Sequence, residues 1–188
     1  MSLTRSAIML AAIYGVLVLA FTGIGMAVAA PGAQVGGTRS LGTIPGHLLE
    51  LAFFGLLLGA ASAVFYGRKG LPLFLLTPFL VVLLDLDHIP AYLGLSQPIR
   101  PAHSFVFLLF ALVSAAIVLR RIDLELILTS SFMAHLGVDS GLFPPFSPLS
   151  FEYIQVDPYR VPLLVGSVTF ALLAGLFWRN RVKGKSAR

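Results

Sequence analysis

Histidines and aspartates at helical spacings are the residues of this chain whose types could do chemistry. His135 and Asp139 are four positions apart and Asp85 and His88 are three apart, so each pair shares one face if its segment is helical. Imidazole and carboxylate together are typical ligands of zinc, iron and manganese. The chain has no cysteine, which excludes thiolate ligands and disulfides. The pattern therefore indicates a divalent-metal site, with zinc favoured.

Further candidate ligands accompany these two pairs. His47 and Glu50 repeat the three-residue spacing, His103 precedes another apolar run, and Asp87 falls on a different helix face from Asp85. The candidates outnumber the roughly four ligands of a tetrahedral site, so either two metals bind or some groups only orient the ligand rings. The candidate metal ligands are His47, Asp85, Asp87, His88, His103, His135 and Asp139.

The composition places this site in a membrane protein. Only 11% of the 188 residues are charged, whereas 57% are hydrophobic. A typical soluble domain has about 25% charged residues. The net charge of +5 is carried by short basic clusters beside apolar runs, which is typical of membrane proteins rather than of nucleic-acid binders. We therefore expect an all-α, polytopic helical bundle in contact with membrane lipid, and no nucleic-acid partner.

Six apolar stretches could supply the helices of this bundle. A helix needs about 20 apolar residues to cross a bilayer. The first, second and last stretches reach or approach this length, whereas the other three do so only by including polar residues at one end. We expect Pro90 to end the third helix. The stretches are residues 6–30, 47–66, 71–84, 104–119, 124–138 and 161–178.

The first stretch has two interpretations. Residues 26–31, Met-Ala-Val-Ala-Ala-Pro, resemble a signal-peptidase site, but the apolar core exceeds the roughly 7–15 residues of a signal peptide. A retained anchor over residues 1–30 is favoured and gives about six transmembrane helices, whereas cleavage would leave five. Residues 31–46 are then an external loop, 47–178 a membrane-embedded metal-site domain, and 179–188 a basic cytoplasmic tail.

The basic residues predict how the chain crosses the cell membrane. If six helices are threaded with the N-terminus in the cytoplasm, ten of the 13 Lys and Arg residues fall on the cytoplasmic side. The other three, Arg39, Arg100 and Arg160, fall outside. The same threading brings every histidine to the outer side, although the threading was chosen from the Lys and Arg residues and the apolar stretches alone. We therefore expect a multi-pass protein with both termini in the cytoplasm and the metal site facing outward.

Four short motifs follow one another along the chain: His47, Asp85-Leu86-Asp87-His88, Arg100-Pro101-Ala102-His103-Ser104, and His135 to Asp139 followed by Pro145-Phe146-Ser147. In this order, over about residues 45–150, they resemble the YdjM-like family of membrane-bound metal-dependent hydrolases. The chain departs from the family pattern in having Leu84 in place of a proline and no histidine at positions 96–99. The family is itself distantly similar to zinc-dependent phospholipases C and P1-type nucleases.

The first hypothesis for function, in line with this resemblance, is a metal-dependent hydrolase at the outer membrane face, and the interfacial depth of the site favours a lipid or lipid-linked phosphoester as substrate. The metal would activate water near neutral pH. Asp87 or Glu50 would serve as general base, and Arg100 would hold a phosphate through two N–H groups. The implied metal ligands are His88, His103, His135 and Asp139, with Asp85 or Asp87 bridging.

Two other functions fit the same residues. A divalent-cation transporter would also place carboxylates and imidazoles within the membrane. A transport path, however, needs polar groups through the full depth, whereas these gather at one side. The third possibility is a non-catalytic membrane protein with a structural metal. Cation uptake into proteoliposomes would identify a transporter, turnover without uptake an enzyme, and neither result a structural protein.

Overall fold

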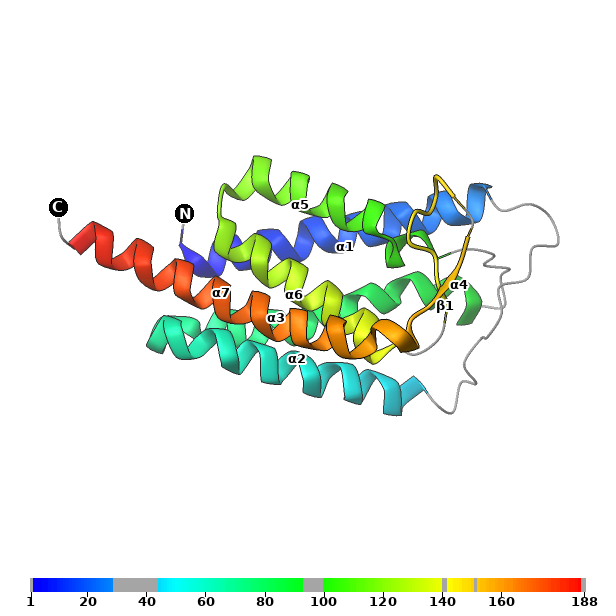
Figure 1. The fold of residues 1–188 in the computed structure, drawn as a ribbon. Coiled ribbons are helices and arrows are strands. Elements are labelled where there is room, and N and C mark those ends of the chain that lie inside the picture. Colours follow the sequence, from blue (N-terminus) through cyan, green and yellow to red (C-terminus); the bar gives the residue numbers. More distant parts are fainter. Residues whose placement is uncertain (1, 29–43, 93–99, 140–141, 151, 187–188) are drawn as a thin grey trace.

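The computed structural model describes residues 2–28, 44–92, 100–139, 142–150 and 152–186. Within these ranges the protein is an all-α bundle whose six main helices run along its length (Figure 1). Each main helix covers one of the predicted apolar stretches, which confirms the helical bundle. These helices are α1 (Leu3–Val28), α2 (Ile44–Tyr66), α3 (Leu71–Leu83), α5 (Phe105–Leu119), α6 (Ile122–Val138) and α7 (Arg160–Ser186).

Short elements connect the main helices at the two ends of the bundle. The chain does not stop being helical at Pro90, because α3 passes through a 3-10 turn into α4, where proline is the second residue and needs no backbone N–H donor. The short elements are η2 (Gly67–Gly70), η3 (Leu84–His88), α4 (Ile89–Tyr92), η4 (Pro101–His103), β1 (Leu142–Phe143), β2 (Ile154–Gln155) and η5 (Asp157–Tyr159). The two strands pair antiparallel.

Four helical segments are long and apolar enough to cross a membrane: Leu3–Val28, Gly46–Tyr66, Leu71–His88 and Asp157–Asn180. Apolar side chains also point outward from the bundle, such as Val64, which is 78% exposed. An outer surface of this kind requires lipid rather than water around it. The protein is therefore a membrane protein, as its composition predicts.

Close backbone contact joins α2 to α3, and glycine makes it possible. A Cβ atom on Gly59 would lie 2.7 Å from the Phe74 carbonyl oxygen, and one on Gly55 would overlap the backbone of Pro78. Small residues at helix interfaces are common in membrane bundles, where packing and not water exclusion drives association. This contact holds α3, and hence η3, in place beside α2.

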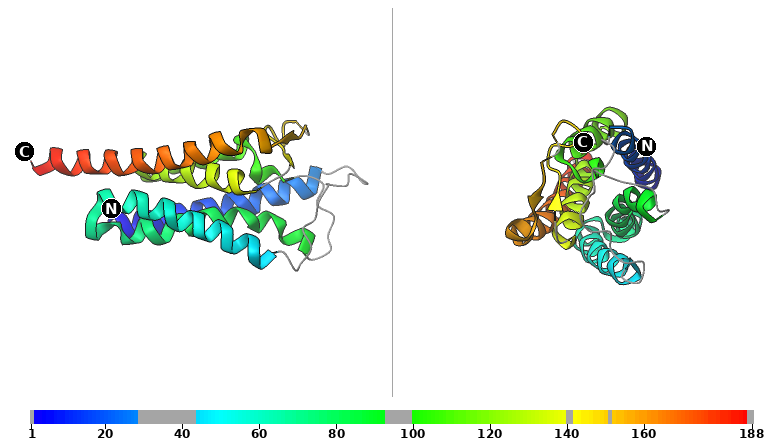
Figure 2. Two further views of the ribbon diagram at one scale, coloured as in Figure 1. Left: turned by 60° about the horizontal axis from the view of Figure 1, so that its bottom comes forward. Right: turned by 90° about the vertical axis from the view of Figure 1, so that its right-hand side faces the viewer.

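The first helix begins and the last one ends at the same end of the bundle (Figure 2). Toward this end lies a polar cluster of side chains from α2, α6 and α7. Arg121 pairs with Asp123 through both Nε and Nη2, with the Nε–Oδ1 distance 3.1 Å. The Tyr66 hydroxyl donates to Asp123 Oδ2 at 3.0 Å, and the Tyr66 ring stacks on Trp178 with 4.8 Å between centroids. The cluster ties α2, α6 and α7 together.

Two predicted segments are only partly covered by these ranges. Most of the external loop predicted at residues 31–46, namely 31–43, lies outside the described residues, and α2 begins at Ile44. The tail predicted at residues 179–188 continues α7 as a helix up to Ser186.

Candidate metal centre

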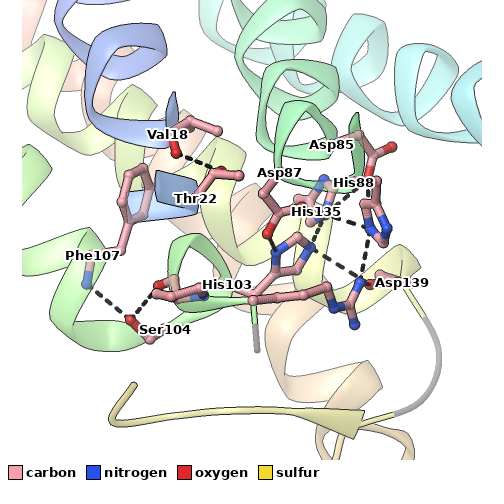
Figure 3. A network of polar contacts seen from close by, with 12 residues as sticks. Val18, Thr22, Asp85, Asp87, His88, His103, Ser104, Phe107, His135 and Asp139 are labelled. Carbon is pink, nitrogen blue, oxygen red and sulfur yellow. Dashed lines mark hydrogen bonds and ion pairs between the residues drawn. The ribbon is translucent and has the colours of Figure 1, made fainter. Parts of the chain in front are cut away.

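The predicted ligands meet at the end of the bundle opposite to the Arg121 cluster, where four segments converge (Figures 1 and 3). In η3, three residues make one turn, so Asp85 and His88 lie on one face with Oδ1 and Nε2 3.5 Å apart. The contributing residues are His47 from α2, Asp85, Asp87 and His88 from η3, His103 from η4, His135 from α6, and Asp139, which caps the end of α6.

His103 is positioned by a capping motif that follows it directly. The Ser104 hydroxyl accepts a hydrogen bond from the backbone N–H of Phe107 at 3.1 Å, which caps the start of α5. The same hydroxyl donates to the Pro101 carbonyl at 2.6 Å. These two bonds fix the η4 turn against α5, so the His103 ring enters the bundle at a defined height.

The rings of His103 and His135 face each other through their Nε2 atoms, 2.9 Å apart (Figure 3). His135 Nδ1 lies 2.7 Å from the Val81 carbonyl, which can only accept, so Nδ1 carries the ring proton. His103 Nδ1 lies 2.7 Å from Asp87 Oδ2, and donates to it when Asp87 is a carboxylate. Both Nε2 atoms then present lone pairs to the same point.

Lone pairs at this distance repel unless a proton or another cation lies between them. Both rings are fully buried. Burial holds the pKa of His103 well below its ordinary value, which favours the neutral ring. Imidazole rings that turn their Nε2 lone pairs to one point provide the donors that a metal cation requires.

Carboxylates complete the arrangement. Asp85 Oδ1 lies 3.7 Å from His135 Nε2, and Asp139 Oδ2 lies 3.7 Å from His103 Nε2. Neither buried oxygen of Asp85 has a hydrogen-bond partner among the described residues. A buried carboxylate in this state is costly unless a cation offsets its charge.

The donor atoms form two overlapping groups, Asp85 with His103 and His135, and Asp87 with His88 and His103, each within 4.8 Å. The first group fits a metal. Two nitrogens about 2.0–2.1 Å from a tetrahedral zinc lie roughly 3.3 Å apart, so the observed 2.9 Å would have to widen by only about 0.4 Å. These buried groups could hold a metal ion, as the spacing in the sequence predicts.

Arg100 lies within the cluster and not beside it. Its Nη1 is 2.8 Å from His88 Nε2 and donates to Asp139 Oδ2 at 3.3 Å, while Nη2 donates to the Leu142 carbonyl at 3.1 Å. A guanidinium only donates, so His88 Nε2 accepts here and its Nδ1 carries the proton. In this arrangement the guanidinium supplies a positive charge to His88 and Asp139.

Two predicted residues lie further from this core. His47 Nε2 is 3.7 Å from Asp85 Oδ2, so it borders the first donor group through that carboxylate. Glu50, expected as an alternative general base, is exposed on α2, and no hydrogen bond or ion pair joins it to the cluster among the described residues. The general-base role expected for Glu50 stays a prediction.

Two buried groups, the Val81 carbonyl in the centre and the Tyr14 side chain in α1, could not be singled out from residue types and spacing. The Val81 carbonyl fixes the tautomer of His135, yet any residue at that position offers the same carbonyl. Tyr14 lies fully buried in α1 with its ring against Phe107, and its hydroxyl has no hydrogen-bond partner among the described residues. A lone tyrosine in the middle of an apolar stretch was the available clue to its burial.

Comparison with protein-family models, curated proteins and solved structures gives no match. The function is therefore inferred from the residues of the centre themselves.

Proposed function

We propose that the protein is a membrane-bound metal-dependent hydrolase whose centre holds a divalent cation, with zinc favoured over iron or manganese. His103 and His135 would hold the cation through Nε2, and Asp85 and Asp139 through carboxylate oxygens. Two imidazoles and two carboxylates make a donor set suited to these metals. The bound cation would supply Lewis acidity and activate water near neutral pH.

The facing Nε2 atoms of His103 and His135, 2.9 Å apart, are the observation that carries this proposal. The Nδ1 partner of each ring, Asp87 for one and the Val81 carbonyl for the other, directs its Nε2 lone pair inward. Partners of this kind are typical of histidines that bind metal, because they fix the tautomer and the orientation of the ring. The Asp85 carboxylate, whose buried oxygens accept no hydrogen bond from the described residues, supports the same conclusion.

The other polar residues then have distinct tasks. Asp87, fully buried and bonded to His103, is a positioning residue, and the general-base role predicted for it would need its second oxygen. Arg100 binds the substrate phosphate.

The substrate class proposed is a phosphoester, either lipid or lipid-linked. The Arg100 guanidinium suits a phosphate oxyanion, because its N–H groups can donate in pairs. A site at one end of a lipid-facing bundle meets amphiphiles at headgroup depth. The order of the His47, Asp85 to His88, Arg100 to Ser104 and His135 to Asp139 motifs, which resembles the YdjM-like family, supports this class.

We also propose that all six main helices cross the cell membrane, with both termini in the cytoplasm and the centre outside. The start of α1 and the end of α7 lie at the same end of the bundle, and the centre lies at the other (Figure 1). The predicted excess of Lys and Arg on the side of the termini supports this orientation. Whether α1 is retained does not change the placement of the centre.

A cation transporter and a structural metal site are the rival functions. A transport path would need polar groups continuing toward the other end. At the end of the bundle opposite to the metal centre, the Asp123 carboxylate is bound by Arg121 and Tyr66. Proteoliposomes loaded with a zinc-sensitive dye would report uptake if the protein were a transporter.

Turnover assays on the purified protein test the proposal. Phosphomonoesters, phosphodiesters and phospholipids are incubated with zinc-, manganese- or iron-loaded protein, beside His135→Ala and Arg100→Gln. We expect metal-dependent release of product that is lost in His135→Ala. In Arg100→Gln, metal should remain bound while KM rises. Bound metal without any turnover would contradict the hydrolase and favour a structural metal.

A further inference from the structure

An apolar cavity of about 300 Å³ lies between α5, α6, α7 and the paired strands. Almost all of its wall is hydrocarbon, and the Tyr159 hydroxyl is the one polar side-chain group among its lining residues. Water in such a cavity would lack the two to four polar partners, roughly, that a buried water needs. Its main lining residues are Phe105, Met133, Phe143, Ile154 and Leu163.

This cavity is joined to the metal centre by short stretches of chain. Phe105 follows His103 by two residues, and its ring lies 5.5 Å from that of Phe143. Phe143 in turn follows Leu142, whose carbonyl accepts from Arg100 at 3.1 Å. Arg100, which contacts the centre directly, is thus held by the strand that also forms the cavity wall.

The mouth of the cavity opens on the outer surface of the bundle. Ile154 and Tyr159 at its wall are 36% and 53% exposed. The neighbouring α7 surface carries Val161 and Val165, which are both largely exposed and face lipid in a membrane protein. Hydrocarbon is therefore the material that meets the mouth.

The volume also limits the occupant. Ligand pockets usually measure about 300–1,000 Å³, so this cavity suits one chain and not a whole lipid with its headgroup. The Arg100 guanidinium, which donates to the Leu142 carbonyl of β1, complements a phosphate.

We infer that the cavity binds one acyl chain of a membrane phospholipid, with the lipid phosphate directed toward Arg100. This inference rests on the proposed function, because it names the substrate class of the same centre. The β1–β2 pair then acts as a divider, with the metal centre on one side and the chain on the other. The cavity would limit the length of the acyl chain that can bind, and Arg100 would bind the reacting phosphate.

Photolabelling of metal-free protein tests chain binding without turnover. Phosphatidic acid with a diazirine at the end of one acyl chain is added in lipid nanodiscs, and the labelled residues are mapped by mass spectrometry. Ile154→Trp fills the mouth of the cavity, and Ile154→Ala leaves it open. Leu149→Trp, on the exposed segment before β2, is the matched control for introducing tryptophan.

We expect saturable labelling at Met133 and Leu163 that excess unlabelled phosphatidic acid removes. Ile154→Trp should lower it about tenfold, as the loss of burial for two methylene groups implies. Labelling should persist in Ile154→Ala and Leu149→Trp. Diacylglycerol, which lacks the phosphate, should compete much less well.

Labelling spread over exposed helix faces such as Val165, with no competition, would overturn the inference. Equal competition by diacylglycerol would overturn the part played by Arg100. If labelling is saturable but the purified protein binds no metal under any loading condition, the acyl-chain site is supported and the proposed hydrolase is rejected. If the protein turns over phosphoesters but labelling is not saturable, the hydrolase is supported and the acyl-chain site is rejected.

Discussion

His103 Nε2 lies 2.9 Å from His135 Nε2, although 32 residues separate the two histidines in the chain. Each ring has its Nδ1 held by an acceptor, which is Asp87 for His103 and the Val81 carbonyl for His135. The two inward lone pairs and the Asp85 carboxylate, whose oxygens accept no hydrogen bond from the described residues, gather donor atoms at one point inside an apolar bundle. A divalent cation at this point would stabilise all three groups at once.

Asp87→Asn should weaken metal binding without removing a ligand of the proposed metal. The amide carries no charge to hold the His103 ring and can present an N–H instead of an acceptor. Loss of such an orienting partner typically lowers metal affinity by about 10–100-fold. Competition titration with a zinc chelator measures the change. Asp157→Asn, which alters an exposed acid in η5, is the control and should bind as wild type does.

The protein should lose its bound metal as the pH falls. Zinc binds the neutral imidazole, so protonation of the ligands competes with metal and acid releases it. An ordinary histidine has a pKa of about 6.5, and burial holds the pKa of His103 below that value. Bound zinc, measured after dialysis at fixed free zinc between pH 8 and pH 4, should therefore be kept through pH 6.5 and lost below it. Loss of half the zinc above pH 7 would be inconsistent with this environment.

Asp123→Asn should destabilise the bundle and leave metal binding intact. The substitution removes the carboxylate that accepts from Arg121 and Tyr66, and leaves a buried guanidinium unpaired. Breaking a buried ion pair on one side typically costs about 3–5 kcal/mol. Thermal unfolding in detergent should show a lower Tm than wild type. The double variant Asp123→Asn with Arg121→Met should recover part of the lost Tm, because no buried charge is then left unpaired. A Tm lower than that of Asp123→Asn alone would show that loss of the ion pair does not cause the destabilisation.

Gly59→Ala tests the contact that places η3. The added Cβ would meet the Phe74 carbonyl at 2.7 Å, so α2 and α3 must separate. We expect a lower Tm together with weaker metal binding, because η3 follows α3 directly. Gly23→Ala is the matched control, since a Cβ there meets nothing within 4 Å. In a helix that change alone should stabilise by up to about 1 kcal/mol.

The helices and the meeting of the site residues were predictable from sequence for physical reasons. Apolar stretches must be helical in lipid, and alternating the direction of six helices brings His47, His88, His103 and His135 to one end. The i, i+3 relation of Asp85 and His88 also holds, through a 3-10 turn that keeps the two residues on one face.

Other features depend on packing that spacing does not encode. The exposure of Glu50 follows from how α2 is rotated against its neighbours, which a uniformly apolar helix does not reveal. Arg100 contacts His88 and Asp139 because tertiary packing brings the start of η4 beside η3 and the end of α6, which no local spacing encodes. Pairing of β1 with β2 joins short pieces separated by a proline-rich stretch, for which no alternation of side chains was visible.

Metal content of the purified protein is the most direct test of the central claim. Wild type, His103→Ala, His135→Ala and the exposed control Asp157→Ala are loaded separately with zinc, manganese and iron, desalted and analysed by mass spectrometry for metal per chain. We predict stoichiometric metal, with zinc retained best, in wild type and Asp157→Ala, and its loss in both histidine variants that remain folded. Wild-type protein without metal under every loading condition, or histidine variants that keep it, would contradict the account.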